Sequence, residues 1–205
     1  MINHNKLDRI FFLAKVILIY LLFCININSS AQNIKERLIT VGINDAPVKI
    51  KVFSSLTCPH CANFHISVVP KLKKYIDSGK VQIIFIDFPL DKAAFNASKL
   101  LHCLDREKQI SFLDKIYKDQ EKWISGSTID EINKNLKKIV KSFGINNIEF
   151  DKCVNNDIIA DRILNNRIDA HKKYSIEATP TIVINEKKLK EASLKNIIKR
   201  IEKLI

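Results

Sequence analysis

The chain has 205 residues, 46% of them hydrophobic and 27% charged, which is typical of a globular protein and excludes a disordered or fibrous one. Its formal net charge is +12, but the lysines are scattered over all the predicted helices, and no Arg-rich or aromatic-interleaved cluster occurs. We therefore expect no nucleic acid as a partner and interpret the basic residues as solvated surface.

The N-terminal residues are typical of a secretory signal peptide. A basic start is followed by ten apolar residues, VILIYLLFCI at positions 16–25, too short a run for a bilayer span of about 20 residues. Ser29 and Ala31 then fit the small-x-small pattern of a signal-peptidase site. We predict a signal peptide over residues 1–31, cleaved after Ala31, and a mature protein in the periplasm.

Other interpretations of this segment stay open. An uncleaved anchor or a buried core helix would have the same apolar run. A lipid anchor on Cys24 is disfavoured because Phe23 is bulkier than the small residue usual before such a cysteine.

The first core elements alternate between strand and helix. Residues 32–47 form a leading segment that ends in an Asp-Ala-Pro turn, and residues 48–52 then alternate apolar residues with lysines, as a strand does. After Thr57 the apolar residues recur at helical spacing, which predicts a helix to about Asp77. Within this helix, Pro70 should cause a kink because it removes a backbone hydrogen bond.

A continuous apolar run over residues 80–88 predicts a strand buried on both faces. From residue 91 to about residue 175 only helical patterns occur, at 93–104, 109–121, 129–143, 149–155 and 158–174. Strand patterns return at 181–185 and 187–189, and an amphipathic helix ends the chain. This order predicts an α/β fold in which a helical block interrupts one sheet-forming domain.

Four cysteines lie outside the predicted signal peptide: Cys58, Cys61, Cys103 and Cys153. An even number of cysteines in an extracytoplasmic protein favours disulfides over free thiols. The three-residue spacing pairs Cys58 with Cys61, which leaves Cys103 with Cys153. Two free buried thiols are the alternative for the second pair.

The sequence Cys58-Pro59-His60-Cys61 could bind a metal, form a permanent staple or exchange electrons. Structural zinc needs four ligands, and the sequence has no second C-x-x-C, while His60 and His65 cannot easily complete a tetrahedron from one short turn. A disulfide across so small a loop restricts the unfolded chain very little, so it would be a poor staple. Both interpretations are disfavoured.

Redox chemistry fits the pair better. Cys58 follows a predicted strand and begins a predicted helix, where backbone N–H groups favour a thiolate, and a protonated His60 would add to this effect. A stable thiolate favours the reduced pair and so makes the disulfide a strong oxidant. Cys61 lies one turn further along and could attack a mixed disulfide at Cys58.

These motifs resemble those of the DsbA-like thiol–disulfide oxidoreductases of the thioredoxin superfamily. The stretch SLTCPHC matches their active-site motif, ATPT at residues 178–181 matches the loop whose proline is cis in that family, and GKVQIIFIDFPLD resembles the strand after the active-site helix. The resemblance covers essentially residues 40–205. It implies a thioredoxin-like domain of residues 32–89 and 176–205, interrupted by an all-helical domain of residues 90–175.

The resemblance also implies a function and site residues. The protein would be a protein disulfide oxidoreductase that introduces disulfides into reduced, unfolded secreted proteins, and a quinone-linked membrane oxidase of the DsbB type would re-oxidise it. Cys58 would be the nucleophile and Cys61 the resolving thiol, and the disulfide itself would be the redox group, with no metal or organic cofactor. The candidate catalytic residues are Cys58, Cys61, His60, Pro59, Thr179 and Pro180.

Two departures from the family pattern concern the site. The family often places a buried acid six residues before the first cysteine, where this chain has Val52, so the proton route to Cys61 must differ. The pair Cys103 and Cys153 looks like the second disulfide that some DsbA-like proteins carry in the helical block. It would stabilise the fold by about 4 kcal/mol in the entropy model.

Two alternative functions stay open. Family isomerases add an N-terminal dimerisation domain that this sequence lacks, so we expect a monomeric oxidant rather than a reductase or isomerase. A thioredoxin-fold binding module or chaperone is the alternative from another class. The remaining histidines, His65, His102 and His171, are interpreted as structural or surface residues because none has a visible partner.

Overall fold

The computed structural model describes Lys15 and residues 38–205. The predicted signal peptide therefore lies outside the described residues, apart from Lys15. Within the described part, no helix combines the length and apolar character that a membrane crossing needs. Residues 38–205 form one unit.

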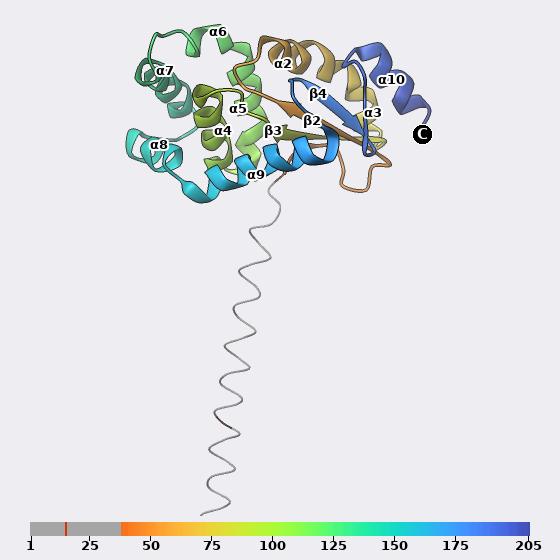
Figure 1. Ribbon diagram of the computed structural model, residues 1–205, viewed down its shortest axis with the longest axis horizontal. Coiled ribbons are helices and arrows are strands. Elements are labelled where there is room, and N and C mark those ends of the chain that lie inside the picture. The colour runs from red at the N-terminus through yellow and green to blue at the C-terminus, as the bar shows by residue number, and fades with distance from the viewer. Residues whose placement is uncertain (1–14, 16–37) are drawn as a thin grey trace, which may run out of the picture. The chain divides into compact units, whose positions relative to one another are not determined.

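The centre of this unit is a five-stranded mixed sheet with the order β1-β3-β2-β4-β5 (Figure 1). Strand β2 pairs in parallel with β3 and antiparallel with β4, and the two edge strands, β1 and β5, pair antiparallel with β3 and β4. The bounds are β1 Ile39–Val41, β2 Val48–Ser54, β3 Val81–Asp87, β4 Thr181–Ile184 and β5 Lys187–Lys188. Strand β1 lies in the stretch that we expected to be a leading segment only.

The sheet is covered on both faces, as the apolar run of β3 predicts. Alternate residues of β2 enter two separate clusters of buried side chains: Val52 belongs to the larger one, with Ile197 of the C-terminal helix, and Phe53 to the smaller one, with Ala170. In Figure 1, α9 runs along one side of the sheet, and α2, α3 and α10 lie on the other.

The connection from β2 to β3 is helical from Pro59 to Asp77, as predicted, but the helix changes type along its length. The segments are the α-helix α2 Pro59–Asn63, the π-helical turn η1 Phe64–Val68, the 3-10 turn η2 Val69–Leu72 and the α-helix α3 Lys73–Asp77. Pro70 lies in the 3-10 turn, and its missing N–H accounts for the interrupted α-helical hydrogen bonding around it.

Between β3 and β4 the chain is all helical, which confirms the predicted insertion. The helices are α4 Lys92–Cys103, α5 Arg106–Lys118, α6 Gln120–Trp123, α7 Ile129–Lys141, α8 Asn147–Val154 and α9 Asp157–Tyr174. The expected helix over 109–121 is in fact two helices, because the chain departs from helical geometry at Asp119. Helix α10, Leu194–Glu202, ends the fold. The domain limits at residues 89/90 and 175/176 stay a proposal.

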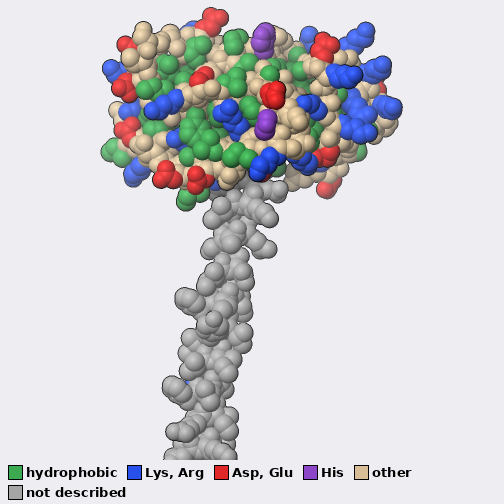
Figure 2. Space-filling model, in the orientation of Figure 1, with side chains coloured by type: hydrophobic (Ala, Val, Ile, Leu, Met, Phe, Trp, Pro, Cys, Tyr) green, Lys and Arg blue, Asp and Glu red, His purple; other side chains and the backbone are tan. Residues whose placement is uncertain are grey.

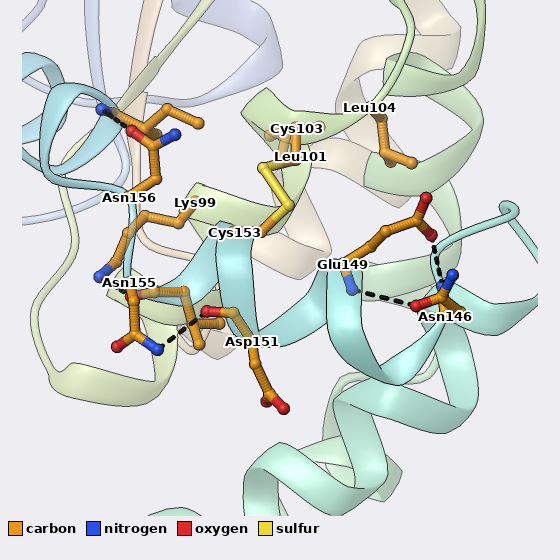
Figure 3. Close-up of a disulfide and its surroundings, with 12 residues drawn as sticks. Lys99, Leu101, Cys103, Leu104, Asn146, Glu149, Asp151, Cys153, Asn155 and Asn156 are labelled. Carbon is orange, nitrogen blue, oxygen red and sulfur yellow. Dashed lines mark hydrogen bonds between the residues drawn. A yellow bond between two sulfur atoms is a disulfide. The ribbon is translucent and has the colours of Figure 1, made fainter.

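A disulfide joins two helices of this insertion. Cys103, the last residue of α4, and Cys153 of α8 are linked at an S–S distance of 2.17 Å across a sequence separation of 50 residues (Figure 3). Next to it, Lys99 of α4 donates a hydrogen bond to the carbonyl of Val154. The link therefore ties α8 to the helix that directly follows β3.

Candidate active site

Cys58 stands where the sheet meets the first helix. It is the N-cap residue of α2, with extended backbone, and Pro59 takes the first helical position. The Cys58 N–H donates to the Ser55 carbonyl at 3.1 Å, while the Cys58 carbonyl accepts from Cys61 N and Ala62 N, both at 3.1 Å. These bonds fix the predicted strand-to-helix junction at the first cysteine.

The two cysteines of this motif carry free thiols in the structure, and they differ in their surroundings. Cys58 is 8% exposed and Cys61 only 2%. The Cys58 thiol donates to the Thr179 carbonyl at 3.4 Å. The peptide bond between Thr179 and Pro180 is cis, as predicted. The loop before β4 therefore lies directly against the first sulfur.

Burial raises the pKa of the Cys61 thiol to about 12. The Thr179 side chain and the Ser55 backbone favour the thiolate, but the loss of hydration outweighs both, and a negative charge on Cys58 would oppose ionisation further. Cys61 therefore keeps its proton at neutral pH unless another group takes it.

The remaining expected site residues lie around these two sulfurs. Pro59 and His60 are exposed on the first turn of α2. Val52 is buried at 2% exposure and pairs with Phe85 of β3 and Ile182 of β4. The position at which the family often has an acid is therefore apolar here.

Two polar side chains that we did not anticipate support the active-site loop. Gln120 of α6 is buried, and its Nε2 donates to the carbonyls of Leu56 at 2.8 Å and Cys58 at 3.1 Å. Asp91 accepts from Thr57 Oγ1 at 2.6 Å and from Ala94 N at 2.7 Å, so it links the loop to the start of α4. The contacts of Gln120 and the contact between Asp91 and Thr57 have no signal in the sequence, because they join residues at least 34 positions apart.

The histidines correct one expectation, because His65, His102 and His171 do have partners. His65 Nε2 lies 2.7 Å from Asp114 Oδ1. His102 Nε2 lies 2.6 Å from Asp87 Oδ2, and both side chains of that pair are buried. His171 Nδ1 lies 3.2 Å from the carbonyl of Ile176. Among the described residues, no group of three or more His, Cys, Asp or Glu side chains could hold a metal ion.

An apolar groove of about 610 Å³ adjoins the loop that carries Thr179. Hydrophobic side chains gather over α9 on the face that Figure 2 draws. Two apolar side chains of α9, Leu164 and Ile168, are 42% and 47% exposed. The groove is lined by Phe88, Leu164, Arg167, Ile168, His171, Lys172, Ile176 and Glu177.

Comparisons with known proteins agree with this geometry. The family model described as thioredoxin matches residues 35–203. A protein of Rickettsia bellii, named as a protein-disulfide oxidoreductase, is 30% identical over 174 residues, which are 84% of this chain and 66% of the relative. Disulfide bond formation protein D of Bacillus subtilis is 27% identical over 80% of this chain and 75% of its own length.

A solved structure shares the fold. The crystal structure of alpha-DsbA1 from Wolbachia pipientis is 31% identical, with a TM-score of 0.74 over 82% of this chain and 90% of that one. The chain spans about two thirds of the length of the Rickettsia relative. The thioredoxin-like sheet, its helical insertion and these matches show that the chain belongs to the DsbA-like thiol–disulfide oxidoreductases.

Proposed function

We propose that the protein introduces disulfide bonds into reduced, unfolded secreted proteins by dithiol–disulfide exchange at Cys58-Pro59-His60-Cys61. The difference between the two sulfurs carries this proposal. Cys58 lies against the cis-proline loop, whereas Cys61 is almost fully buried with a pKa of about 12. A thiolate arriving from outside would therefore attack Cys58, and Cys61 would react only with the sulfur of Cys58.

The surroundings support a polypeptide substrate. The Thr179 carbonyl, already an acceptor for the Cys58 thiol, belongs to the loop in which Thr179 and Pro180 would offer backbone groups to an extended chain. The apolar groove lies beside Ile176 and Glu177, close in sequence to that loop. Unfolded proteins expose apolar side chains that could enter such a groove, which favours them over folded substrates. Pro59 and His60, exposed on the first turn, would tune the potential.

The cellular setting is part of the proposal. A signal peptide over residues 1–31 would direct the protein to the periplasm, where a quinone-linked membrane oxidase of the DsbB type would re-oxidise the Cys58–Cys61 pair. The disulfide itself would be the redox group, the Cys103–Cys153 link would be structural, and the protein would act as a monomer.

Oxidation of a reduced, unfolded test protein checks this function. The oxidised protein should convert thiols of the test protein to disulfides, counted by alkylation and mass spectrometry, and Cys58→Ser should abolish the conversion. Cys61→Ser should accumulate a Cys58–glutathione adduct with glutathione disulfide, because the resolving thiol is missing. A potential more reducing than that of the glutathione couple, or full function in Cys58→Ser, would overturn the proposal in favour of a reductase or a binding module.

A further inference from the structure

Cys61 has to gain or lose a proton in every exchange reaction, although it is buried. When a substrate attacks Cys58, the Cys61 sulfur leaves as a thiolate, and its high pKa favours rapid protonation. In the opposite step the thiol must lose its proton before it can attack. Val52, buried in the same cluster as Cys61, has no titratable group.

A histidine lies one helical turn away from this thiol. His65 follows Cys61 by four residues along the helical segment, and side chains at that spacing are neighbours on a helix surface. His65 is 6% exposed, and its ring packs against Phe85 of β3, at a centroid distance of 5.4 Å, and against Tyr117 of α5, at 4.9 Å. The ring is therefore held on the buried side of the helix, the side that also carries Cys61.

The two ring nitrogens of His65 differ. Nε2 lies 2.7 Å from Oδ1 of Asp114, whereas Nδ1 is buried and has no hydrogen-bond partner within residues 38–205. A neutral imidazole that donates from Nε2 to the carboxylate keeps a free lone pair on Nδ1. A buried acceptor without a hydrogen bond, such as this Nδ1, lowers the stability of the fold, which is consistent with a functional role for the atom.

Asp114 connects this ring to water. Its side chain is 65% exposed, while that of His65 is 7% exposed. A carboxylate at Nε2 orients the ring and stabilises the imidazolium that forms when Nδ1 takes a proton. The pair thus spans the distance from the protein interior to solvent.

Further titratable groups near Cys61 in the described part of the chain include Tyr117 and the bonded pair of Asp87 and His102. Burial raises the pKa of Tyr117 well above its usual value, and negative charge on Cys61, Asp87 and Cys58 raises it further, so the phenol stays protonated and cannot serve as a base. Asp87 is already bonded to His102 at 2.6 Å. His102 Nδ1 is also unpartnered and buried, which makes this second pair the rival candidate.

We propose that His65, positioned by Asp114, exchanges the Cys61 proton with solvent during disulfide exchange. The inference rests on the proposed roles of Cys58 and Cys61. When a substrate thiolate attacks Cys58, the Cys58–Cys61 bond breaks, a substrate–Cys58 disulfide forms, and the Cys61 thiolate takes a proton from the His65 imidazolium. In the opposite direction Nδ1 takes the Cys61 proton, and the thiolate attacks Cys58 of a mixed disulfide and expels the bound thiolate.

The two steps can be timed separately with one equivalent of dithiobis-nitrobenzoate on the reduced protein. The first nitrothiolate released reports attack by Cys58, and the second reports attack by Cys61 on the mixed disulfide. In His65→Gln the second release should slow by about 10²-fold, the usual contribution of a proton-transfer group, while the first release is unchanged. The rate of the second release in His65→Gln should then rise tenfold per pH unit, because hydroxide has to remove the Cys61 proton in place of the imidazole.

Two further variants test the assignment. Asp114→Asn should slow the second release less than His65→Gln, because the imidazole remains; it also carries the test if His65→Gln does not fold. His102→Gln removes the rival histidine and should leave both releases unchanged.

Several results would overturn the inference. One is an equal rate of second release in wild type and His65→Gln. Another is a slower second release in His102→Gln instead. A third is that His65→Gln slows both releases and also loses stability. A wild type that releases no second nitrothiolate would contradict the resolving role of Cys61, and so the proposed function itself.

Discussion

The side chain of Gln120 donates a hydrogen bond to the carbonyl of Cys58, with 3.1 Å between Nε2 and the oxygen. The same nitrogen donates to the carbonyl of Leu56 at 2.8 Å, and the Gln120 side chain is buried. A residue of the helical insertion thus holds the backbone of the loop that carries the first cysteine.

Gln120→Met should weaken both the fold and the reactivity of Cys58. Removing the donor leaves the buried Leu56 carbonyl without this partner, which should lower the free energy of unfolding by about 1–3 kcal/mol. The freed loop should also slow the attack of Cys58, by up to about 10²-fold if the sulfur shifts by an ångström. Denaturant unfolding and the first nitrothiolate release measure the two effects.

Gln109→Met is the matched control. Gln109 is also buried, and its Nε2 donates to the carbonyls of Leu101 and Leu104, each at 3.4 Å, inside the helical insertion. We expect a loss of stability of the same kind with unchanged Cys58 kinetics. Equal kinetic effects in the two variants would contradict a specific role for Gln120.

Replacing both Cys103 and Cys153 by serine should destabilise the protein without stopping the chemistry at Cys58. The link closes a loop of 50 residues, and the entropy model assigns such a loop about 4 kcal/mol. Unfolding by denaturant under non-reducing conditions measures the loss. If both nitrothiolate releases also changed, the second disulfide would influence the active site as well.

Local patterns predicted much of this fold. The alternation in β2 and the apolar run of β3 predicted the ends of both strands to within two residues. Such patterns are local, because they depend only on which side chains of the strand itself are buried. The three residues of β1 are too few to show a period, and that strand exists only through its pairing with β3. The change to π and 3-10 geometry around Pro70 was likewise anticipated only as a kink.

Some residues of the active site could likewise be predicted from local sequence, and others could not. The spacing of Cys58 and Cys61 and the loop at Pro180 could be read from consecutive residues. The partners of Gln120 and His65 could not, since each contact depends on how distant helices pack, and a single sequence holds no information on such pairs. Asp114 as the partner of His65 was therefore not expected from the sequence.

Glu186→Gln should cost stability at neutral pH but not in acid. Hydrogen bonds from Lys173, Lys51 and Tyr174 lower the pKa of Glu186 to about 2 from 4.5. A carboxyl with a depressed pKa stabilises the fold above its unfolded pKa, and this contribution disappears as the pH falls from 4.5 towards 2. Because the Glu186 side chain is 52% exposed, we expect at most about 1 kcal/mol.

Unfolding of wild type and Glu186→Gln at neutral pH and near pH 2 measures this difference. Added salt should reduce it at neutral pH by screening the charges. A difference that persists in acid would assign the effect to packing rather than to charge.

The reduced protein should lose stability in alkali because of Cys61. Its folded pKa of about 12 lies above the ordinary value of 9.0, so below pH 9 both folded and unfolded chains hold the proton and the contribution is constant. Between pH 9 and 12 the unfolded chain loses the proton first, and stability falls by up to about 1.4 kcal/mol per pH unit.

Lysines and tyrosines titrate in the same range, so the quantity to measure is the difference in unfolding free energy between reduced wild type and Cys61→Ser. Both keep Cys58, and only the wild type should show the extra slope; parallel pH profiles would mean that the Cys61 pKa is not raised in the folded protein.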